Sequence, residues 1–164
     1  KSIFILQLHR DLYKFENVGI GGIFKSTDNI IEEQDIAGNK HVRFAPVPAW
    51  ETPESIERLC EAYNKALNAA NVDPLLLIPM FILDFLCIHP FSDGNGRIGR
   101  LWQTLILSHW QPMLAYLPVE TVIKNRQQDY YQLLTESDHK SDCSAFIEFL
   151  LQAIEDSLQE AIST

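Results

Sequence analysis

The sequence predicts an all-α fold, a compact helical bundle that is interrupted by one β-hairpin. Apolar residues recur at helical spacing over most of the chain, and proline-containing motifs mark where helices begin. One internal stretch lacks this spacing and is rich in glycine and β-branched residues. We expect helices over residues 2–15, 52–68, 74–88, 97–110, 119–136 (as one helix or two) and 144–161.

The first expected helix, residues 2–15, places its apolar side chains on roughly one face. Residues three or four positions apart lie on the same side of a helix, so such spacing predicts a face that packs against the bundle. The members of this face are Ile3, Leu6, Leu8, Leu12 and Phe15.

A β-hairpin is expected at about residues 20–45. Gly38 and Asn39 supply turn residues between short β-rich pieces. These pieces are Gly22–Lys25 with Ile30–Ile31, and Val42–Phe44. Because the stretch is glycine-rich, we interpret it as a mobile hairpin, or flap.

Two helix starts follow the hairpin. Thr52-Pro53 combines an N-cap hydroxyl with a proline at the first helical position, and Asp73-Pro74 repeats this arrangement. The helix after Asp73 should continue to about Ile88 and is apolar nearly all round. A helix of that kind belongs in the middle of the fold.

The charge balance disfavours polyanionic partners. The chain has 22 Asp and Glu against 13 Lys and Arg, which gives a formal net charge of -9. A domain that follows a phosphodiester backbone is expected to carry the opposite sign, so we expect no nucleic acid partner. An anionic membrane surface is disfavoured for the same reason. A local basic pocket can still hold a small phosphate ligand.

Cysteine usage and apolar runs indicate a cytoplasmic protein. The cysteines lack CxxC spacing, which is typical of reduced thiols; they are Cys60, Cys87 and Cys143. The longest apolar stretch, residues 75–88, contains Pro79 and Asp84 and is too short to span a bilayer. The chain begins with Lys1 rather than Met, so we expect it to be a piece of a longer protein.

The segment HPFSDGNGRIGR at residues 89–100 concentrates chemically active residues after the apolar helix. His89 can take a proton near neutral pH, although a histidine at a helix end can also simply satisfy terminal carbonyls. Asp93 suits Mg²⁺, which proteins often hold through one carboxylate together with phosphate oxygens. The alternative for Asp93 is an N-cap of the next helix.

The second half of this segment suits an anion. Gly94-Asn95-Gly96 allows backbone N–H groups to converge on an anion at a helix start. An ordinary turn is the alternative interpretation of the same three residues. Arg97 and Arg100 share one face of the first helical turn. Two cations there are unfavourable with the helix dipole, so a bound polyphosphate explains them better than surface solubility does.

Taken together, these residues predict a site that moves a phosphate-containing group onto a hydroxyl. The match of residues 94–99 to GxGxxG does not indicate a dinucleotide fold, because that motif requires a preceding strand and here a helix precedes it.

HPFSDGNGRIGR resembles the signature of Fic-domain proteins, HxFx[D/E]GNGRxxR, without a mismatch. The resemblance extends to GIFKSTDNII and FAPVPA upstream and to NRQQDYYQLL downstream, and so covers nearly the whole chain, residues 1–164, as a single Fic domain. It implies the Fic fold and transfer of AMP from ATP, with Mg²⁺, to a Ser, Thr or Tyr of a protein, including self-modification.

The resemblance also implies roles for individual residues of the motif. His89 would deprotonate the attacking hydroxyl, and Asp93 would hold the Mg²⁺. Asn95, with the amides of Gly94 and Gly96, would bind the region of the α-phosphate.

The remaining implied roles concern the outer phosphates, the target and the base. Arg97 and Arg100 would grip the β- and γ-phosphates. The hairpin around Ile31 and Glu32 would clamp a segment of the target protein by strand addition. Tyr130 would line the adenosine pocket, although an ordinary core aromatic is an equally simple interpretation. The sequence leaves a homodimer open.

Three departures from the family pattern stand out. Lys25 replaces an arginine that is common in the family, and Asp138 lies near where relatives place an asparagine against the base. A self-inhibitory [S/T]xxxE[G/N] helix would pair its glutamate with Arg100, but the nearest match, Ser144–Glu148, is followed by Phe149.

Two alternatives to AMP transfer remain at this point. The same fold could remove AMP or transfer another phosphate-containing group. A nucleotide-sensing regulatory module without turnover is the other reading.

Overall fold

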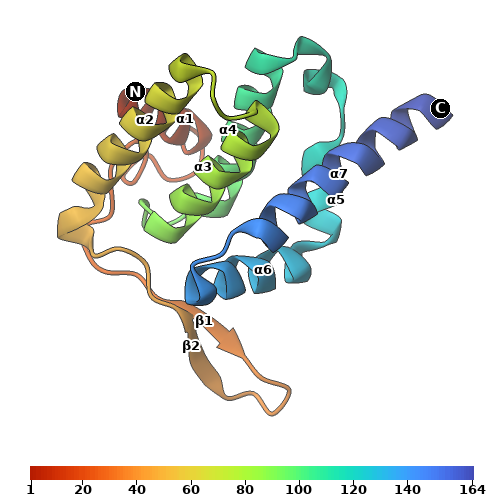
Figure 1. Cartoon of the computed structure of the whole chain (residues 1–164). Coiled ribbons are helices and arrows are strands. Elements are labelled where there is room, and N and C mark those ends of the chain that lie inside the picture. Colours follow the sequence, from red (N-terminus) through yellow and green to blue (C-terminus); the bar gives the residue numbers. More distant parts are fainter.

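The computed structural model describes residues 1–164, except for the side chains of Glu33 and Asp138, so the expectation for Asp138 lies outside the described residues. Helices and one antiparallel hairpin make up the fold, which confirms the predicted class (Figure 1). The α-helices are α1 (Ser2–Leu12), α2 (Thr52–Ala69), α3 (Pro74–Ile88), α4 (Asn95–Trp110), α5 (Val119–Asn125), α6 (Gln127–Lys140) and α7 (Ser144–Ser163). The strands are β1 (Ile31–Gln34) and β2 (Lys40–Phe44).

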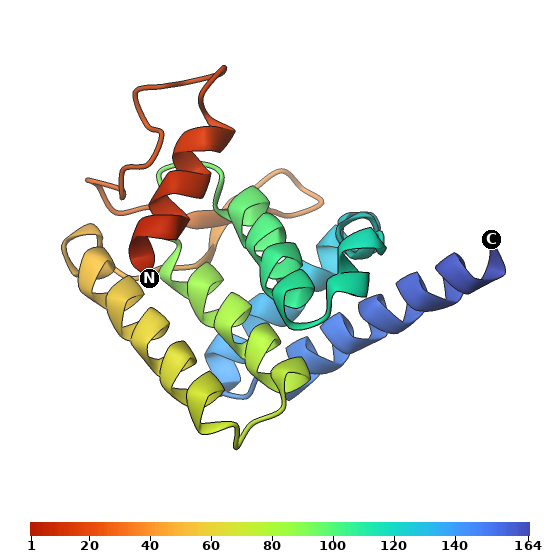
Figure 2. The same cartoon turned by 90° about the horizontal axis from the view of Figure 1, so that it is seen from above.

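Helix α3 lies at the centre of the bundle because it is apolar almost all round. Asp73 begins it as predicted, since its carboxylate accepts a hydrogen bond from the backbone N–H of Leu75 at 2.9 Å. Helices α2, α4 and α7 pack around α3 (Figure 2). Its buried side chains include Ile78, Ile82, Phe85 and Leu86. The C-terminal end of α3 is therefore held firmly by the core.

Helix α1 buries the predicted face only in part: the three leucines of that face pack against the core, but the most buried residues are others. Ile5 and His9 are its buried residues, and Tyr13 is buried just beyond its end. In contrast, Ile3 is 62% exposed and Phe15 is 90% exposed. The prediction failed at Ile3 and Phe15, because the helix ends before Phe15 and because Ile5 and His9 occupy the centre of the buried face.

Strands β1 and β2 form a hairpin that projects from the helical body (Figure 1). Ile31 pairs with Phe44, and Gln34 pairs with Lys40. Phe44 is buried and anchors the base, whereas Ile36 near the tip is fully exposed. The hairpin thus has an anchored base and a solvent-exposed tip.

The predicted strand piece at Gly22–Lys25 is not a strand. The backbone N–H of Lys25 donates to the carbonyl of Pro90 at 2.9 Å, so this segment runs against the loop that follows α3. At its other end, the N–H of Gly22 donates to Nδ1 of His9 in α1. The segment is thus held by the loop and by α1 rather than by the sheet, which is why its β-rich composition misled the prediction.

The predicted start of α2 is correct, but the predicted cap is wrong. Thr52 continues a short 3-10 helix, Ala49–Glu51, and its hydroxyl donates to the carbonyl of Pro48 at 2.9 Å. The N-cap of α2 is instead Glu51, and no side chain caps the N–H groups of this helix.

The C-terminal third of the chain forms α5, α6 and α7. Residues 119–140 make two helices that are separated at Arg126, and α7 packs against both of them. The cysteines of the described chain are free thiols. Among the helices described here, none combines the length and apolarity that crossing a bilayer requires.

Candidate active site

The candidate active site lies where α3 ends and α4 begins, and His89 is its first residue. His89 adopts a left-handed conformation (φ 51°, ψ 61°), which ends α3 and turns the following chain. Its Nδ1 lies 3.3 Å from the carbonyl oxygen of Leu86. A carbonyl can only accept, so Nδ1 carries the proton and Nε2 is the acceptor.

The environment of His89 favours the neutral imidazole. Burial lowers the pKa of His89 from 6.5 to about 4, and the ammonium of Lys25 acts in the same direction. The hydrogen bond to the carbonyl of Leu86 opposes this shift only in part. Near neutral pH the ring is therefore neutral, and its Nε2 is able to accept a proton.

Asn95 holds the loop in shape from the first turn of α4. Its Oδ1 accepts from the N–H of Phe91 at 2.8 Å, and its Nδ2 donates to the carbonyl of Phe91 at 2.7 Å. Asn95 is buried, and so is Phe91, whose ring stacks on His9 with centroids 3.7 Å apart. The side chain of Asn95 is thus committed to the loop, and only its backbone remains for a ligand.

Side chains from the segment before β1 also hold the loop in shape. The ammonium of Lys25 donates to the carbonyl of Ile88 at 3.1 Å and to Oδ1 of Asn29 at 2.7 Å. Asn29 in turn donates to the carbonyls of Phe91 at 3.0 Å and of His89 at 3.3 Å. Burial lowers the pKa of Lys25. Lys25 stood out in the sequence, whereas nothing near Asn29 indicated its partners, which lie some 60 residues away.

Asp93 presents an ionised carboxylate at the site and does not cap α4. The N-cap is Gly94, with φ 83°, and no side chain caps this helix. The hydroxyl of Tyr13 donates to Oδ2 of Asp93 at 2.7 Å, and this bond lowers the pKa of the carboxyl group. The Asp93 side chain is 69% exposed, so a ligand can reach it.

The donor set fits a Mg²⁺ ion that is shared with a nucleotide, but not a site built by the protein alone. Among the described residues, no group of three or more His, Cys, Asp or Glu side chains is placed to hold a metal. Asp93 by itself is the kind of ligand that Mg²⁺ uses together with phosphate oxygens and water. A metal at this site would therefore depend on the bound phosphates.

Arg97 and Arg100 both face the loop, in different environments. Arg97 donates to the Tyr13 hydroxyl at 2.5 Å and pairs with Glu16 at 3.4 Å, in a partly exposed position. Arg100 is only 14% exposed, and its Nε lies 3.6 Å from a carboxylate oxygen of Glu120. This Nε is buried and has no hydrogen-bond partner among the described residues.

These groups open onto a single cavity of about 340 Å³. The predicted residues that line it are His89, Asp93, Gly94, Asn95, Gly96, Arg97 and Arg100, and they are joined by Ser92, Gln127 and Tyr131. The structure therefore brings a proton acceptor, a carboxylate and two guanidinium groups together.

Three predicted site residues lie outside this cavity. Tyr130 is buried in the core against Phe146, and burial raises its pKa, so it does not line this cavity. Its neighbour Tyr131 lines the cavity instead. Ile31 and Glu32 lie on the hairpin and are not among the residues that line it.

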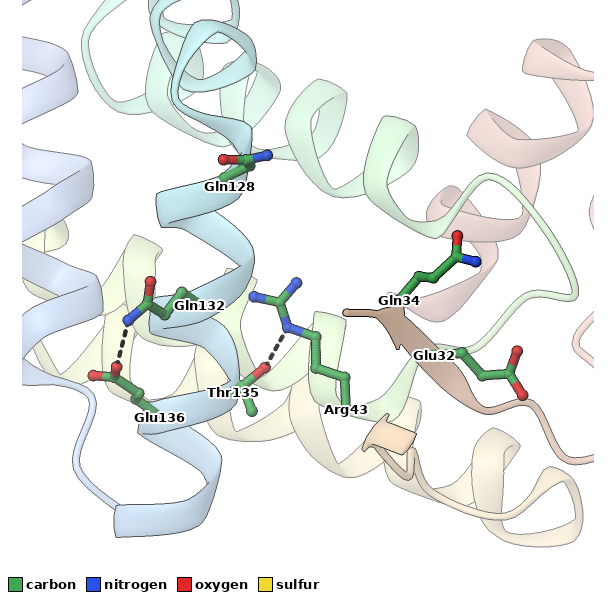
Figure 3. Close-up of a pocket in the computed structure, with 7 residues that line it drawn as sticks. All are labelled: Glu32, Gln34, Arg43, Gln128, Gln132, Thr135 and Glu136. Atoms are coloured by element: carbon green, nitrogen blue, oxygen red, sulfur yellow. Dashed lines mark hydrogen bonds between the residues drawn. The ribbon is translucent and has the colours of Figure 1, made fainter. Parts of the chain in front are cut away.

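A second, larger cavity of about 640 Å³ lies between the hairpin and α6 (Figure 3). Its lining is polar and consists of Glu32, Gln34, Arg43, Gln128, Gln132, Thr135 and Glu136. Arg43 reaches across from β2, and its Nε donates to the Thr135 hydroxyl at 3.0 Å. The Arg43 guanidinium also lies 5.8 Å from the ring centroid of Tyr131, which lines the first cavity. The two cavities are thus adjacent.

Comparison with known families agrees with this fold. The model of the Fic/DOC family matches residues 2–107. The chain therefore belongs to the Fic/DOC family.

Individual relatives support this assignment. The chain is similar to "Protein adenylyltransferase Fic" of Nematostella vectensis, with 29% identity over 92% of this chain and 31% of the relative. It is 30% identical to "Protein adenylyltransferase fic-1" of Caenorhabditis elegans over 73% of this chain and 22% of the relative. The chain thus spans about a third or less of these two proteins.

A solved structure shows the same architecture. A Fic family protein from Desulfovibrio desulfuricans G20 superposes with a TM-score of 0.83 and 40% identity, over 99% of this chain and 47% of that protein.

Proposed function

We propose that this chain transfers AMP from ATP to a Ser, Thr or Tyr hydroxyl of a target protein. The observation that carries the proposal is the shared cavity of His89, Arg97 and Arg100. A proton acceptor beside two cations suits the attack of a hydroxyl on a phosphoryl group. The names of the relatives from Nematostella vectensis and Caenorhabditis elegans support AMP as the transferred group.

In the proposed reaction, Nε2 of His89 accepts the proton of the attacking hydroxyl. The hydroxyl oxygen bonds to the α-phosphorus of ATP, and the bond from this phosphorus to the oxygen that bridges to the β-phosphate breaks. Pyrophosphate leaves with that oxygen, and its charge is paired with Arg97 and Arg100. The negative charge of bound ATP would also raise the pKa of His89, which makes it a better base once the substrate is present.

Other groups of the loop would orient the phosphates. The backbone N–H groups of Gly94, Asn95 and Gly96 open the first turn of α4, where an anion is favoured. Asp93 would hold Mg²⁺, which neutralises phosphate charge when it is bound.

The hairpin is the proposed docking site of the target protein. It is two-stranded, so its edges are unpaired within the sheet and can accept a further strand. Ile31 and Glu32 of β1 would contact the target segment. The second cavity adjoins this strand through Glu32.

The proposal is tested with ATP that carries a label on the α-phosphate, mixed with lysate proteins and Mg²⁺. We expect label to be transferred, and His89→Asn to lower the transfer by about 100-fold or more, which is typical of a lost general base. Asparagine is chosen because it tolerates the left-handed backbone of this position. His109→Asn, on the exposed side of α4, is the matched control.

Parallel reactions with ATP labelled on the γ-phosphate and with AMP-modified proteins distinguish the alternatives. Transfer of a γ-phosphate label would indicate phosphoryl transfer, and release of AMP from modified proteins would indicate the reverse activity. ATP binding without turnover would indicate a nucleotide sensor. Unchanged α-label transfer by His89→Asn would contradict the proposed role of the imidazole.

A further inference from the structure

Tyr13 is a buried residue that contacts both charged groups of the loop although it lies outside the motif. Its hydroxyl donates to Oδ2 of Asp93 at 2.7 Å, across a separation of 80 residues. The same hydroxyl accepts from Nη2 of Arg97 at 2.5 Å. A hydroxyl has one donor and can accept as well, so Tyr13 can serve an anion and a cation together.

The Tyr13 ring also contacts these groups. The guanidinium of Arg97 lies 5.0 Å from the ring centroid, within the range of a cation–π interaction. A Cβ atom at Gly94 would lie 2.7 Å from the Tyr13 hydroxyl oxygen and 2.8 Å from its Cε2. The ring is thus pressed against the backbone that begins α4, and glycine is required there for space as well as for its positive φ.

His9, one helical turn earlier, holds the backbone of the same loop. Its Nδ1 accepts from the N–H of Gly22 at 3.0 Å, so Nε2 carries the proton and donates to the carbonyl of Asp93 at 2.9 Å. The ring stacks on Phe91 with an interplanar angle of 4°. Because His9 and Tyr13 come from one buried helical face, the loop rests on a rigid support.

The Tyr13 hydroxyl lies between two groups that would otherwise attract each other directly. Asp93 and Arg97 are four residues apart, and Oδ2 of Asp93 is already 3.7 Å from Nη2 of Arg97. A closer ion pair would turn the guanidinium away from an anion and would occupy the carboxylate. Tyr13 satisfies both groups while it keeps them apart.

We infer that Tyr13 is a positioning residue, which holds the Arg97 guanidinium and the Asp93 carboxylate in separate orientations that suit one polyphosphate ligand. The inference rests on the proposed function for the identity of that ligand as a nucleotide. The preorganisation of an anion site by Tyr13 does not itself depend on group transfer.

The test is calorimetric titration of metal-free protein with inorganic tripolyphosphate. This ligand has no nucleobase and undergoes no transfer reaction, so the measured affinity depends on the phosphates alone. We expect Tyr13→Phe to bind about tenfold more weakly than the unchanged protein, because a hydrogen bond to a charged group is lost and Arg97 turns to Asp93. Tyr63→Phe is the matched control, since it removes a tyrosine hydroxyl from α2, where the ring packs on Phe81.

A double-mutant cycle separates positioning from general structural support. In the Arg97→Ala background, Tyr13→Phe should change the affinity by less than about twofold, because the group that it positions is gone. Equal losses in both backgrounds, or no loss from Tyr13→Phe alone, would overturn the inference. Amide exchange of residues 93–98 supplies a readout without ligand, and it should be faster in Tyr13→Phe.

These measurements distinguish the inference from the proposed function. If Tyr13→Phe weakens tripolyphosphate binding but the unchanged protein transfers no AMP, the positioning role stands and the proposed function fails. If AMP transfer is observed but neither anion affinity nor loop exchange responds to Tyr13→Phe, the inference fails and the proposed function stands.

Discussion

The loop after α3 and the β-hairpin are built in opposite ways. The loop is short, and side chains from α1, from the segment before β1 and from α4 all bind its backbone. The hairpin is held at its base by buried Phe44 and along β2 by the bond from Arg43 to Thr135, while its tip lies in solvent.

This difference matches what the two regions are proposed to do. Phosphoryl chemistry requires groups that are positioned before the substrate arrives, because misplacement by a fraction of an ångström is costly. A strand that docks a protein segment can adjust its conformation to the partner when few of its own contacts are buried. The contrast therefore predicts that mutations in the loop affect stability and chemistry together, whereas mutations in the hairpin affect docking alone.

The largest effect is expected from Asn95→Ala. The buried N–H of Phe91 would lose its partner, which should lower the free energy of unfolding by about 2–4 kcal/mol. Tripolyphosphate binding should fall to an undetectable level because the loop is released. Thermal and urea denaturation measure the first effect, and Asn68→Ala on the exposed side of α2 is the control. A stable Asn95→Ala protein with unchanged anion affinity would break the proposed contrast.

The next effect concerns pH and His89. The pKa of His89 is about 4 in the folded protein, below the ordinary value of 6.5, so the unfolded chain binds more protons between these values. Stability should therefore fall as pH decreases from 6.5 to 4, by up to about 3 kcal/mol for this group alone. His89→Asn should show a shallower decline in urea denaturation over that range. Both proteins keep buried His9, so parallel curves would contradict the assignment.

The smallest effect on stability is expected from Arg43→Ala in the hairpin. The loss of its bond to Thr135 should cost less than about 1 kcal/mol, because the site is partly exposed. Amide exchange in β1 and β2 should become faster, and target modification should fall while tripolyphosphate affinity stays the same. Lys65→Ala on the exposed side of α2 is the control. A parallel loss of anion affinity would show that hairpin and loop act as one unit.

Local patterns in the sequence were sufficient to predict the fold class and most helix boundaries. Asp73-Pro74 predicted the start of α3 because an N-cap bond spans only two residues. The motif at residues 89–100 predicted a shared site because its members are held close together by the chain itself.

The contacts that shape the site could not be predicted, because they depend on packing between distant segments. Tyr13 and Asp93 are 80 residues apart, and nothing in the sequence near either one indicates the other. The only hint was the spacing of His9 and Tyr13, which puts both on one helical face. The sequence could not show that Tyr131, rather than Tyr130, lines the cavity for a related reason. Neighbouring residues differ by about 100° around a helix, and only packing determines which one faces the core.

The Nε–H of Arg100, which is ion-paired with Glu120 but makes no hydrogen bond among the described residues, has a consequence for how tightly the cavity would bind its ligand. Its Nε was withdrawn from water when the chain folded and received no hydrogen bond in exchange among the described residues. An incoming phosphate oxygen would satisfy this donor without first having to strip it of solvent. Anion affinity at Arg100 should accordingly exceed that at the more hydrated Arg97, even though the two guanidinium groups carry the same charge.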